Sequence, residues 1–223
     1  MRHHIAPLAQ AALVLFAVSA HAVTLETDEQ KSLYALGANM AKQLSRFALT
    51  EQDLAFVEAG LRDGALGKDL QVDLATVGPQ VQQLMTTRGA ALASKEKEAS
   101  KDFLAKASAE DGAETTESGL VYKSLTDGTG DSPAATSRVT VHYRGTLTDG
   151  TEFDSSYKRD KPATFPLNGV VKCWTEALQK MKKGGKARIV CPSDIAYGDA
   201  GRPPLIKPGA TLVFEVELIE IES

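Results

Sequence analysis

The sequence has few of the residues from which metal and redox sites are built. It contains two cysteines, Cys173 and Cys191, and four histidines in 223 residues. Three of the histidines lie in the first 22 residues, so the rest of the chain has His142 alone. Two cysteines and one histidine are too few for the usual zinc constellations or for a paired-histidine site. We therefore expect no metal and no cofactor, and we interpret His142 as a histidine on the face of a sheet.

The chain also lacks an excess of basic residues. Its 25 Lys and Arg residues are outnumbered by 29 Asp and Glu residues, which gives a formal net charge of -4 at pH 7. A nucleic-acid-binding domain normally presents a basic surface to the phosphates, so we expect no nucleic-acid partner. The triplet Gly184-Gly185-Lys186 lacks the spacing of a P-loop, which leaves nucleotide binding as a weak alternative.

No apolar run reaches the roughly 20 residues that a helix needs to cross a bilayer. The run at residues 11–18 follows a basic start at Arg2 and precedes Ala20-His21-Ala22. These features are typical of a secretory signal peptide, residues 1–22, and predict cleavage after Ala22. No cysteine lies directly after the run, which argues against a lipid anchor. We predict a periplasmic or secreted protein without a stable membrane span, and leave association with the outer membrane open.

Residues 23–77 have the apolar periodicity of helices and are interpreted as a helical dimerisation domain. One amphipathic stripe with spacings of three and four is formed by Leu33, Leu36, Met40, Leu44 and Phe47. The segment Thr50-Glu51-Gln52-Asp53 resembles a capping box with Asp in place of Glu, and predicts the start of a second helix. Gly64 and Gly67 are expected to end that helix.

Residues 78–117 are interpreted as a long connecting helix and linker. After Gly78-Pro79, the stretch from Gln80 to about Ala107 is rich in Ala, Lys and Glu, so a helix there cannot bury much apolar surface. We expect it to form an arm, and two copies of the shorter helices to bury their stripes against one another in a homodimer. The alternative is a monomer in which the helices cap the C-terminal domain. Residues 109–118 have no periodicity and mark the domain boundary.

From residue 118 to residue 223 the apolar period changes to two, which predicts strands. Val139, Val141 and Tyr143 share one strand face, and Asp149-Gly150 is typical of a hairpin turn. Further strands are predicted at Lys186–Cys191 and Thr211–Ile221.

One helix interrupts these strands. Its apolar face is formed by Trp174, Ala177, Leu178 and Met181, and Lys182-Lys183-Gly184-Gly185 is expected to end it. A short helix packed on a curved antiparallel sheet makes an α+β domain. The predicted fold class is therefore α+β, with an all-α N-terminal region and a long connecting helix before the sheet.

Several short segments of the C-terminal domain occur in the order and spacing of one known family. They are Val141-His142-Tyr143, Asp149-Gly150, Phe153-Asp154-Ser155-Ser156, Trp174, Ala196-Tyr197-Gly198 and Thr211-Leu212-Val213-Phe214. From about Gly119 to its end, the chain resembles the FKBP-type peptidyl-prolyl cis-trans isomerases. The organisation of the N-terminal region also resembles the macrophage infectivity potentiator (Mip) and FkpA-like subgroup of secreted bacterial dimers. This resemblance implies an FKBP domain at residues 118–223 that accelerates rotation about X-Pro bonds.

The resemblance also implies where catalysis takes place. Carried over by position, the pocket residues are Tyr143, Phe153, Asp154, Arg159, Val170, Val171, Trp174, Tyr197, Leu205, Ile206 and Phe214. Trp174 would form the floor of the pocket, and the aromatic rings of Tyr143, Phe153 and Phe214 would form walls around the substrate proline.

The resemblance implies polar roles as well. The backbone N–H of Val171 would bind a substrate carbonyl, and the Tyr197 hydroxyl would donate a second hydrogen bond. Asp154 and Arg159 would pair at the rim. In this scheme Tyr143, Phe153, Asp154, Val171, Trp174, Tyr197 and Phe214 are catalytic. Substrate or macrolide inhibitors would be held by Arg159, Val170, Leu205 and Ile206.

Four residues depart from the family pattern. Ala163 takes the place of an aromatic wall and is expected to open one side of the pocket. Arg202 and Pro204 alter the loop after Tyr197, where substrate preference is expected to be set, and Cys173 replaces a glycine before the tryptophan. These departures bear on selectivity and on affinity for macrolides more than on activity.

The two cysteines can pair. An even number of cysteines in an exported protein favours a disulfide, here between Cys173 and Cys191. The loop of about 18 residues would give about 3 kcal/mol of stability in the loop-entropy model. The alternative is two buried thiols, one at a helix start and one on a facing strand.

We expect the partners to be proline-containing unfolded or exported proteins, and we expect folding-chaperone activity beside isomerisation. The competing hypothesis is a binding module, a chaperone or adhesion factor that holds unfolded clients without accelerating isomerisation. The complete set of pocket aromatics favours catalysis.

Overall fold

The structure is a computed structural model that describes residues 23–222. The described residues form two compact units, divided between Ala38 and Asn39. The predicted signal peptide and its cleavage after Ala22 lie outside the described residues. Within residues 23–222, no helix combines the length and the apolar character that spanning a membrane requires.

The described part of the first unit contains the start of helix α1 (Asp28–Leu44). The side-chain oxygen of Gln30 accepts hydrogen bonds from the backbone N–H groups of Glu26 (2.7 Å) and Thr27 (3.0 Å). Two N–H groups just before the helix therefore have an acceptor. Leu33 and Leu36 of the predicted stripe are exposed, at 61% and 58%. This apolar stripe is therefore available to a partner.

The second unit continues through a helical turn (Ser45–Phe47) to helix α2 (Glu51–Ala65). The predicted capping box is confirmed, because Thr50 Oγ1 accepts the N–H of Asp53 at 3.2 Å and Asp53 Oδ2 accepts the N–H of Thr50 at 3.0 Å. The helix ends at Ala65, close to the predicted glycines.

Helix α3 (Leu74–Ser108) begins earlier than the sequence predicted. The helix was expected to follow Gly78-Pro79, but Asp73 caps it by accepting the N–H of Ala75 at 2.9 Å. Pro79 lies in the second helical turn, where its missing N–H removes one hydrogen bond. The hydrogen bond of the cap and those of the long helical segment that follows stabilise the helix by more than the missing hydrogen bond at Pro79 costs.

An ion pair with two hydrogen bonds joins α3 to the start of α2. Arg88 Nη1 and Nη2 donate to the two carboxylate oxygens of Asp53, at 2.8 and 3.1 Å. Hydrogen bonds from Arg88 and from Thr50 hold the pKa of Asp53 well below its usual value. Arg88 also donates to the carbonyl oxygen of Phe47 at 3.1 Å, so one side chain fixes the turn, α2 and α3 together.

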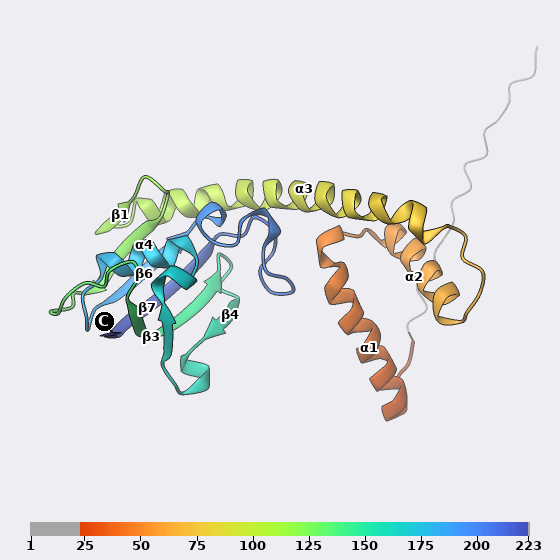
Figure 1. The fold of residues 1–223 in the computed structure, drawn as a ribbon, viewed down its shortest axis with the longest axis horizontal. Helices are drawn as coiled ribbons and strands as arrows, with labels where there is room; N and C mark the ends of the chain where they lie inside the picture. The colour runs from red at the N-terminus through yellow and green to blue at the C-terminus, as the bar shows by residue number, and fades with distance from the viewer. Residues whose placement is uncertain (1–22, 223) are drawn as a thin grey trace, which may run out of the picture. The chain divides into compact units, whose positions relative to one another are not determined.

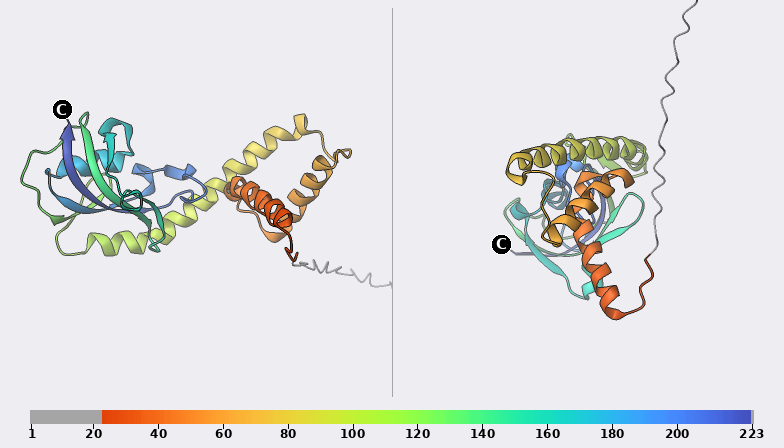
Figure 2. Two further views of the ribbon diagram at one scale, coloured as in Figure 1. Left: turned by 90° about the horizontal axis from the view of Figure 1, so that it is seen from below. Right: turned by 90° about the vertical axis from the view of Figure 1, so that its right-hand side faces the viewer.

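The rest of the second unit is an antiparallel sheet (Figures 1 and 2). Its strands are β1 (Ala113–Thr115), β2 (Val121–Thr126), β3 (Arg138–Leu147), β4 (Glu152–Ser155), β5 (Ala163–Pro166), β6 (Lys186–Cys191) and β7 (Leu212–Glu222). The strand order is β1-β2-β6-β7-β3-β4, and β5 also pairs with β3. Figure 2 shows that the long strands curve.

Helix α4 (Lys172–Lys180) packs on this sheet. As predicted, alternate residues of β3 and β7 are buried, and α4 buries Trp174, Ala177 and Leu178. Met181 lies just beyond the helix end and is also buried. The C-terminal turns of α3 pack against β2, β6 and β7 through Ala107, so the mixed α and β architecture agrees with the predicted α+β class.

Candidate active site

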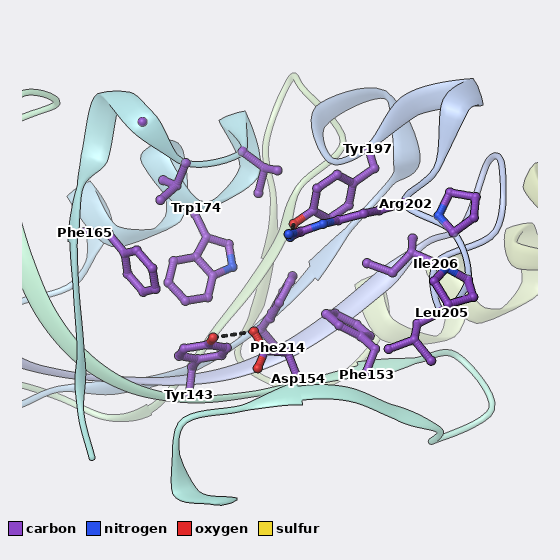
Figure 3. A pocket seen from close by; sticks show the side chains of 15 residues that line it. Tyr143, Phe153, Asp154, Phe165, Trp174, Tyr197, Arg202, Leu205, Ile206 and Phe214 are labelled. Atoms are coloured by element: carbon purple, nitrogen blue, oxygen red, sulfur yellow. Dashed lines mark hydrogen bonds between the residues drawn. The ribbon is translucent and has the colours of Figure 1, made fainter. Parts of the chain in front are cut away.

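A cavity of about 750 Å³ opens between α4, the curved sheet and the loop before β7 (Figure 3). Its lining is mostly aromatic and aliphatic. The lining residues are Tyr143, Phe153, Asp154, Phe165, Gly169, Val170, Val171, Trp174, Tyr197, Arg202, Pro203, Pro204, Leu205, Ile206 and Phe214. We refer to this cavity as the pocket.

The aromatic rings of the pocket pack edge to face around Trp174. The centroid of its indole lies 5.1 Å from that of Tyr143 and 5.3 Å from that of Phe214, with interplanar angles of 86° and 84°. Phe153 meets Phe214 at 5.5 Å and 90°. Because aromatic pairs in this geometry are stabilised beyond their area burial, the rings hold one another in place.

A glycine near the C-terminal end of β3 makes room for two of these rings. A Cβ atom added at Gly145 would lie 2.7 Å from Phe153 Cζ and 2.9 Å from Phe214 Cε1. Any side chain at this position would displace the walls of the pocket. Glycine inside a strand often marks such a close approach, so this signal was present in the sequence, although the predicted site did not include Gly145.

Asp154 is held at the pocket wall by two donors. The Tyr143 hydroxyl donates to Asp154 Oδ2 at 2.5 Å, and Arg159 Nη1 donates to Asp154 Oδ1 at 2.6 Å. Arg159 Nη2 also donates to the Tyr143 hydroxyl oxygen at 2.9 Å, which closes a triangle of hydrogen bonds. Tyr143 and Asp154 both line the pocket, whereas Arg159 is not among the lining residues.

The triangle fixes the protonation states of its members. Burial alone would raise the pKa of Asp154, but the hydrogen bonds from Tyr143 and Arg159 outweigh it and hold that pKa below its usual value. Burial raises the pKa of Tyr143, and the hydrogen bond to Asp154 raises it further. At neutral pH the pocket therefore presents an ionised carboxylate beside a neutral phenol.

The start of α4 places Val171 and Trp174 side by side. The carbonyl oxygen of Val171 accepts the N–H of Trp174 at 2.9 Å, while its own N–H has no acceptor among residues 23–222. The Trp174 Nε1 atom is buried and also lacks a partner within those residues. Among the described residues, the pocket lining thus combines an unpaired backbone donor at Val171 with the indole of Trp174.

Cys173 and Cys191 anchor this helix start to β6. Both are fully buried, their Cα atoms lie 5.8 Å apart, and the structure joins their sulfur atoms. Such a Cα separation is typical of disulfides. A bond here would tie the residue before Trp174 to the sheet.

Tyr197 projects from a loop that packs on α3. The loop approaches the helix so closely that a Cβ atom added at Gly209 would overlap the backbone of Ala93. Lys97 of α3 forms ion pairs of 2.7 Å with both Asp194 and Asp199, which lie on either side of Tyr197 in the sequence. The long helix therefore supports the loop that carries a pocket residue.

The structure brings the residues of the predicted site together. All of them line the pocket except Arg159, which pairs with Asp154 at its edge. Phe165 was not predicted. It lies two residues after Ala163 on β5, and its ring, 5.9 Å from that of Trp174, supplies an aromatic wall on the side that was expected to be open. His142 lies outside the pocket, stacked on Tyr157 at 4.6 Å.

Two family models match successive parts of the chain. The model of FKBP-type peptidyl-prolyl cis-trans isomerases matches residues 130–219. The model of the domain amino-terminal to that isomerase matches residues 29–123. The two matches together span the helical region and the sheet with its pocket.

Curated relatives and solved structures agree with these matches. The chain is 37% identical to the FKBP-type peptidyl-prolyl cis-trans isomerase FkpA of Escherichia coli K12, over 88% of this chain and 77% of that protein. It is 38% identical to the peptidyl-prolyl cis-trans isomerase Mip of Coxiella burnetii, over the full length of both. The crystal structure of FkpA from Escherichia coli is similar with a TM-score of 0.65 and 36% identity, over 89% of this chain and 99% of that one. The chain therefore belongs to the FKBP-type peptidyl-prolyl cis-trans isomerase family.

Proposed function

We propose that the pocket is the active site, and that the chain there accelerates rotation about X-Pro bonds in exported protein clients. The observation that carries this proposal is the aromatic enclosure around Trp174, with Asp154 held ionised at its wall by Tyr143 and Arg159. The enclosure suits a pyrrolidine ring, and the carboxylate lies beside it.

The chemistry that such a pocket performs follows from the amide bond. Rotation about a peptide bond faces a barrier of roughly 18–20 kcal/mol, and an unaided X-Pro bond isomerises in tens to hundreds of seconds. The planar amide is stabilised by charge separation that water supports. Transfer into an apolar pocket with few donors therefore favours the twisted, less dipolar transition state. No bond is made or broken, so no nucleophile is required.

Three polar groups act on the substrate in this scheme, two by orienting it and one by setting the local polarity. The N–H of Val171 donates to a substrate carbonyl, and the Tyr197 hydroxyl, across the pocket from Asp154 in Figure 3, donates a second hydrogen bond. The Asp154 carboxylate sets the polarity near the twisting carbonyl. Each 1.36 kcal/mol removed from the barrier gives a tenfold rate increase, so about 7 kcal/mol gives roughly 10⁵.

Protease-coupled isomerisation of a short prolyl peptide tests this assignment. We expect the double variant Asp154→Ala/Tyr197→Phe to lose at least about tenfold in kcat/KM, since it removes two of the polar contacts. The matched control is Asp111→Ala/Tyr34→Phe, which makes the same changes at exposed positions outside the pocket. An unchanged rate in the first variant would show that the roles assigned to Asp154 and Tyr197 are wrong.

The helical region supports a homodimer. The exposed apolar side chains of α1 include Leu33 and Leu36, and those of α2 include Leu54, Phe56 and Leu61. Apolar stripes of this kind are stabilised by burial against a second copy. Static light scattering should give the mass of a dimer for the chain and of a monomer for Leu33→Glu/Leu36→Glu. A monomeric mass for the unaltered chain would remove the proposal.

The same exposed apolar surface supports chaperone activity as a second function. Unfolded clients bind to apolar patches, so the helices could hold a client while the pocket isomerises it. We expect the double variant Asp154→Ala/Tyr197→Phe to suppress aggregation of an unfolded client as well as the unaltered chain does. If this variant lost isomerase activity and suppression of aggregation to the same extent, clients would bind in the pocket alone.

The export proposal depends on residues 1–22. The predicted leader supports a periplasmic or secreted location, with cleavage after Ala22. Mass spectrometry of the chain recovered from the periplasm of a bacterial host should give a polypeptide that begins at Val23. Recovery of the full chain from the cytoplasm alone would contradict the proposal.

A further inference from the structure

Arg202 is a pocket-lining cation that has no carboxylate partner in the described part of the chain. The other charged side chains at the pocket, Asp154 and Arg159, are paired with each other at 2.6 Å. No Asp or Glu of residues 23–222 lies within ion-pair distance of Arg202. The pocket therefore carries one positive charge that the described protein leaves uncompensated.

The backbone that carries Arg202 is held in place. Its N–H donates to the carbonyl oxygen of Ile206 at 2.8 Å, and the N–H of Ile206 donates back at 3.1 Å. The preceding Gly201 has a φ of 60°, and a Cβ atom added there would lie 2.5 Å from the oxygen of Ile206. Glycine is needed at this close approach. The loop at Pro203, Pro204 and Leu205 is thus closed at its base.

The side chain of Arg202 is directed along Tyr197 into the pocket. Its guanidinium carbon lies 5.9 Å from the centroid of the Tyr197 ring, and Nη1 lies 3.5 Å from the Tyr197 hydroxyl oxygen. Figure 3 shows the guanidinium beside that hydroxyl, with Tyr143 and Asp154 on the other side of the pocket. A cation over an aromatic face is positioned by that contact, and the N–H groups of Arg202 other than the one that donates to Tyr197 remain available to a ligand.

We propose that Arg202 selects substrates with an acidic residue next to the proline. The inference rests on the proposed active site, because a proline seated over Trp174 brings its neighbouring residues to the rim where the guanidinium lies. A guanidinium binds a carboxylate through two parallel hydrogen bonds. Arg202 is exposed, so the contribution of such a pair is modest and depends on salt. The substrate class is therefore a peptide segment with Glu or Asp directly before or after proline.

Peptides that differ by one charge test the proposal. Two pairs of blocked tetrapeptides carry Glu or its uncharged isostere Gln, placed before the proline in one pair and after it in the other. NMR exchange spectroscopy gives kcat/KM for each peptide without a coupling protease. We expect the Glu peptide of at least one pair to be preferred about three- to tenfold at low salt, the range for a partly exposed charged hydrogen bond.

Variants assign that preference to one side chain. In Arg202→Gln the ratio of Glu to Gln peptide should fall to about one, and in Arg202→Lys it should be kept in part. The control Arg62→Gln removes the same charge from α2 and should leave the ratio unchanged. In the unaltered chain the ratio should also fall towards one at about 0.5 M salt, because salt screens the pair. The salt measurement uses only the unaltered chain, so it does not depend on whether a variant folds.

The outcomes separate this inference from the proposed active site. A ratio near one for both pairs in the unaltered chain, or a preference that persists in Arg202→Gln, overturns the role of Arg202. Failure of the chain to isomerise any of the four peptides would instead overturn the proposed active site.

Discussion

Lys97 of α3 and Asp199, two residues after Tyr197, form an ion pair of 2.7 Å. Lys97 makes a second pair of the same length with Asp194, three residues before Tyr197. The hydrogen bonds to Asp194 and then Asp199 raise the pKa of Lys97, so both pairs persist over the neutral range. The long helix is thus joined to the loop on both sides of a pocket residue.

Replacement of Lys97 should weaken catalysis without removing it. Exposed ion pairs contribute little each, so we expect Lys97→Met to lower kcat/KM by about two- to fivefold through a less ordered Tyr197. Lys97→Arg should keep most of the activity, since it preserves the charge. Kinetics on one prolyl peptide at fixed salt check this, and equal rates for Lys97→Met and the unaltered chain would show that the loop is ordered without α3.

A methyl group at Gly145 should disturb the pocket. Because a Cβ atom there would overlap the rings of Phe153 and Phe214, we expect Gly145→Ala to reduce kcat/KM by at least about tenfold and to cost about 1–3 kcal/mol of stability. The control is Gly89→Ala on α3, where an added Cβ atom meets nothing within 4 Å. Chemical unfolding and kinetics measure the two effects. Normal kinetics in Gly145→Ala would mean that catalysis does not depend on the positions of the Phe153 and Phe214 rings.

Activity should not depend on pH near neutrality. The folded pKa of Asp154 is lowered from 3.8, so its contribution to stability is present above that value and is lost only as the pH falls through the folded pKa. The pKa of Tyr143 is raised above 10.0, so the phenol stays neutral at lower pH. We expect a flat profile of kcat/KM from about pH 5 to about pH 9. A step near pH 6 or 7 would point to a titrating group that this account omits.

The two cysteines should be oxidised in an oxidising compartment. Alkylation under denaturing conditions without reductant should add no label to Cys173 or Cys191, and two labels after reduction. The enclosed loop, with a sequence separation of 18, predicts a loss of about 3 kcal/mol in the free energy of unfolding when the bond is reduced. Two labels without reductant would favour the alternative of two buried thiols.

Local patterns predicted most of the second unit. The alternation of Val139, Val141 and Tyr143 and the helical face around Trp174 were enough to place β3 and α4, because burial on one face leaves a period in the sequence. The start of α3 was missed, since Gly78-Pro79 was interpreted as a break and the cap at Asp73 was overlooked.

Contacts between distant residues left no such pattern. Lys97 and Asp194 are 97 residues apart, so nothing in the local sequence indicates that they pair. Phe165 was missed because the wall was expected at Ala163, and only the register of β5 on β3 shows which residue turns its ring to Trp174. Tertiary packing, rather than local propensity, decides these positions.

Trp174 is the only tryptophan of the chain, so its indole N–H gives a single NMR resonance that reports on the pocket floor. The most direct test is a titration of the unaltered chain with a short Leu-Pro peptide, beside the same peptide with Ala in place of proline. If proline is seated over Trp174, the indole resonance should shift and saturate with a midpoint near the KM for isomerisation, and the alanine peptide should have little effect. An indole resonance that stays in place while isomerisation saturates would contradict the account.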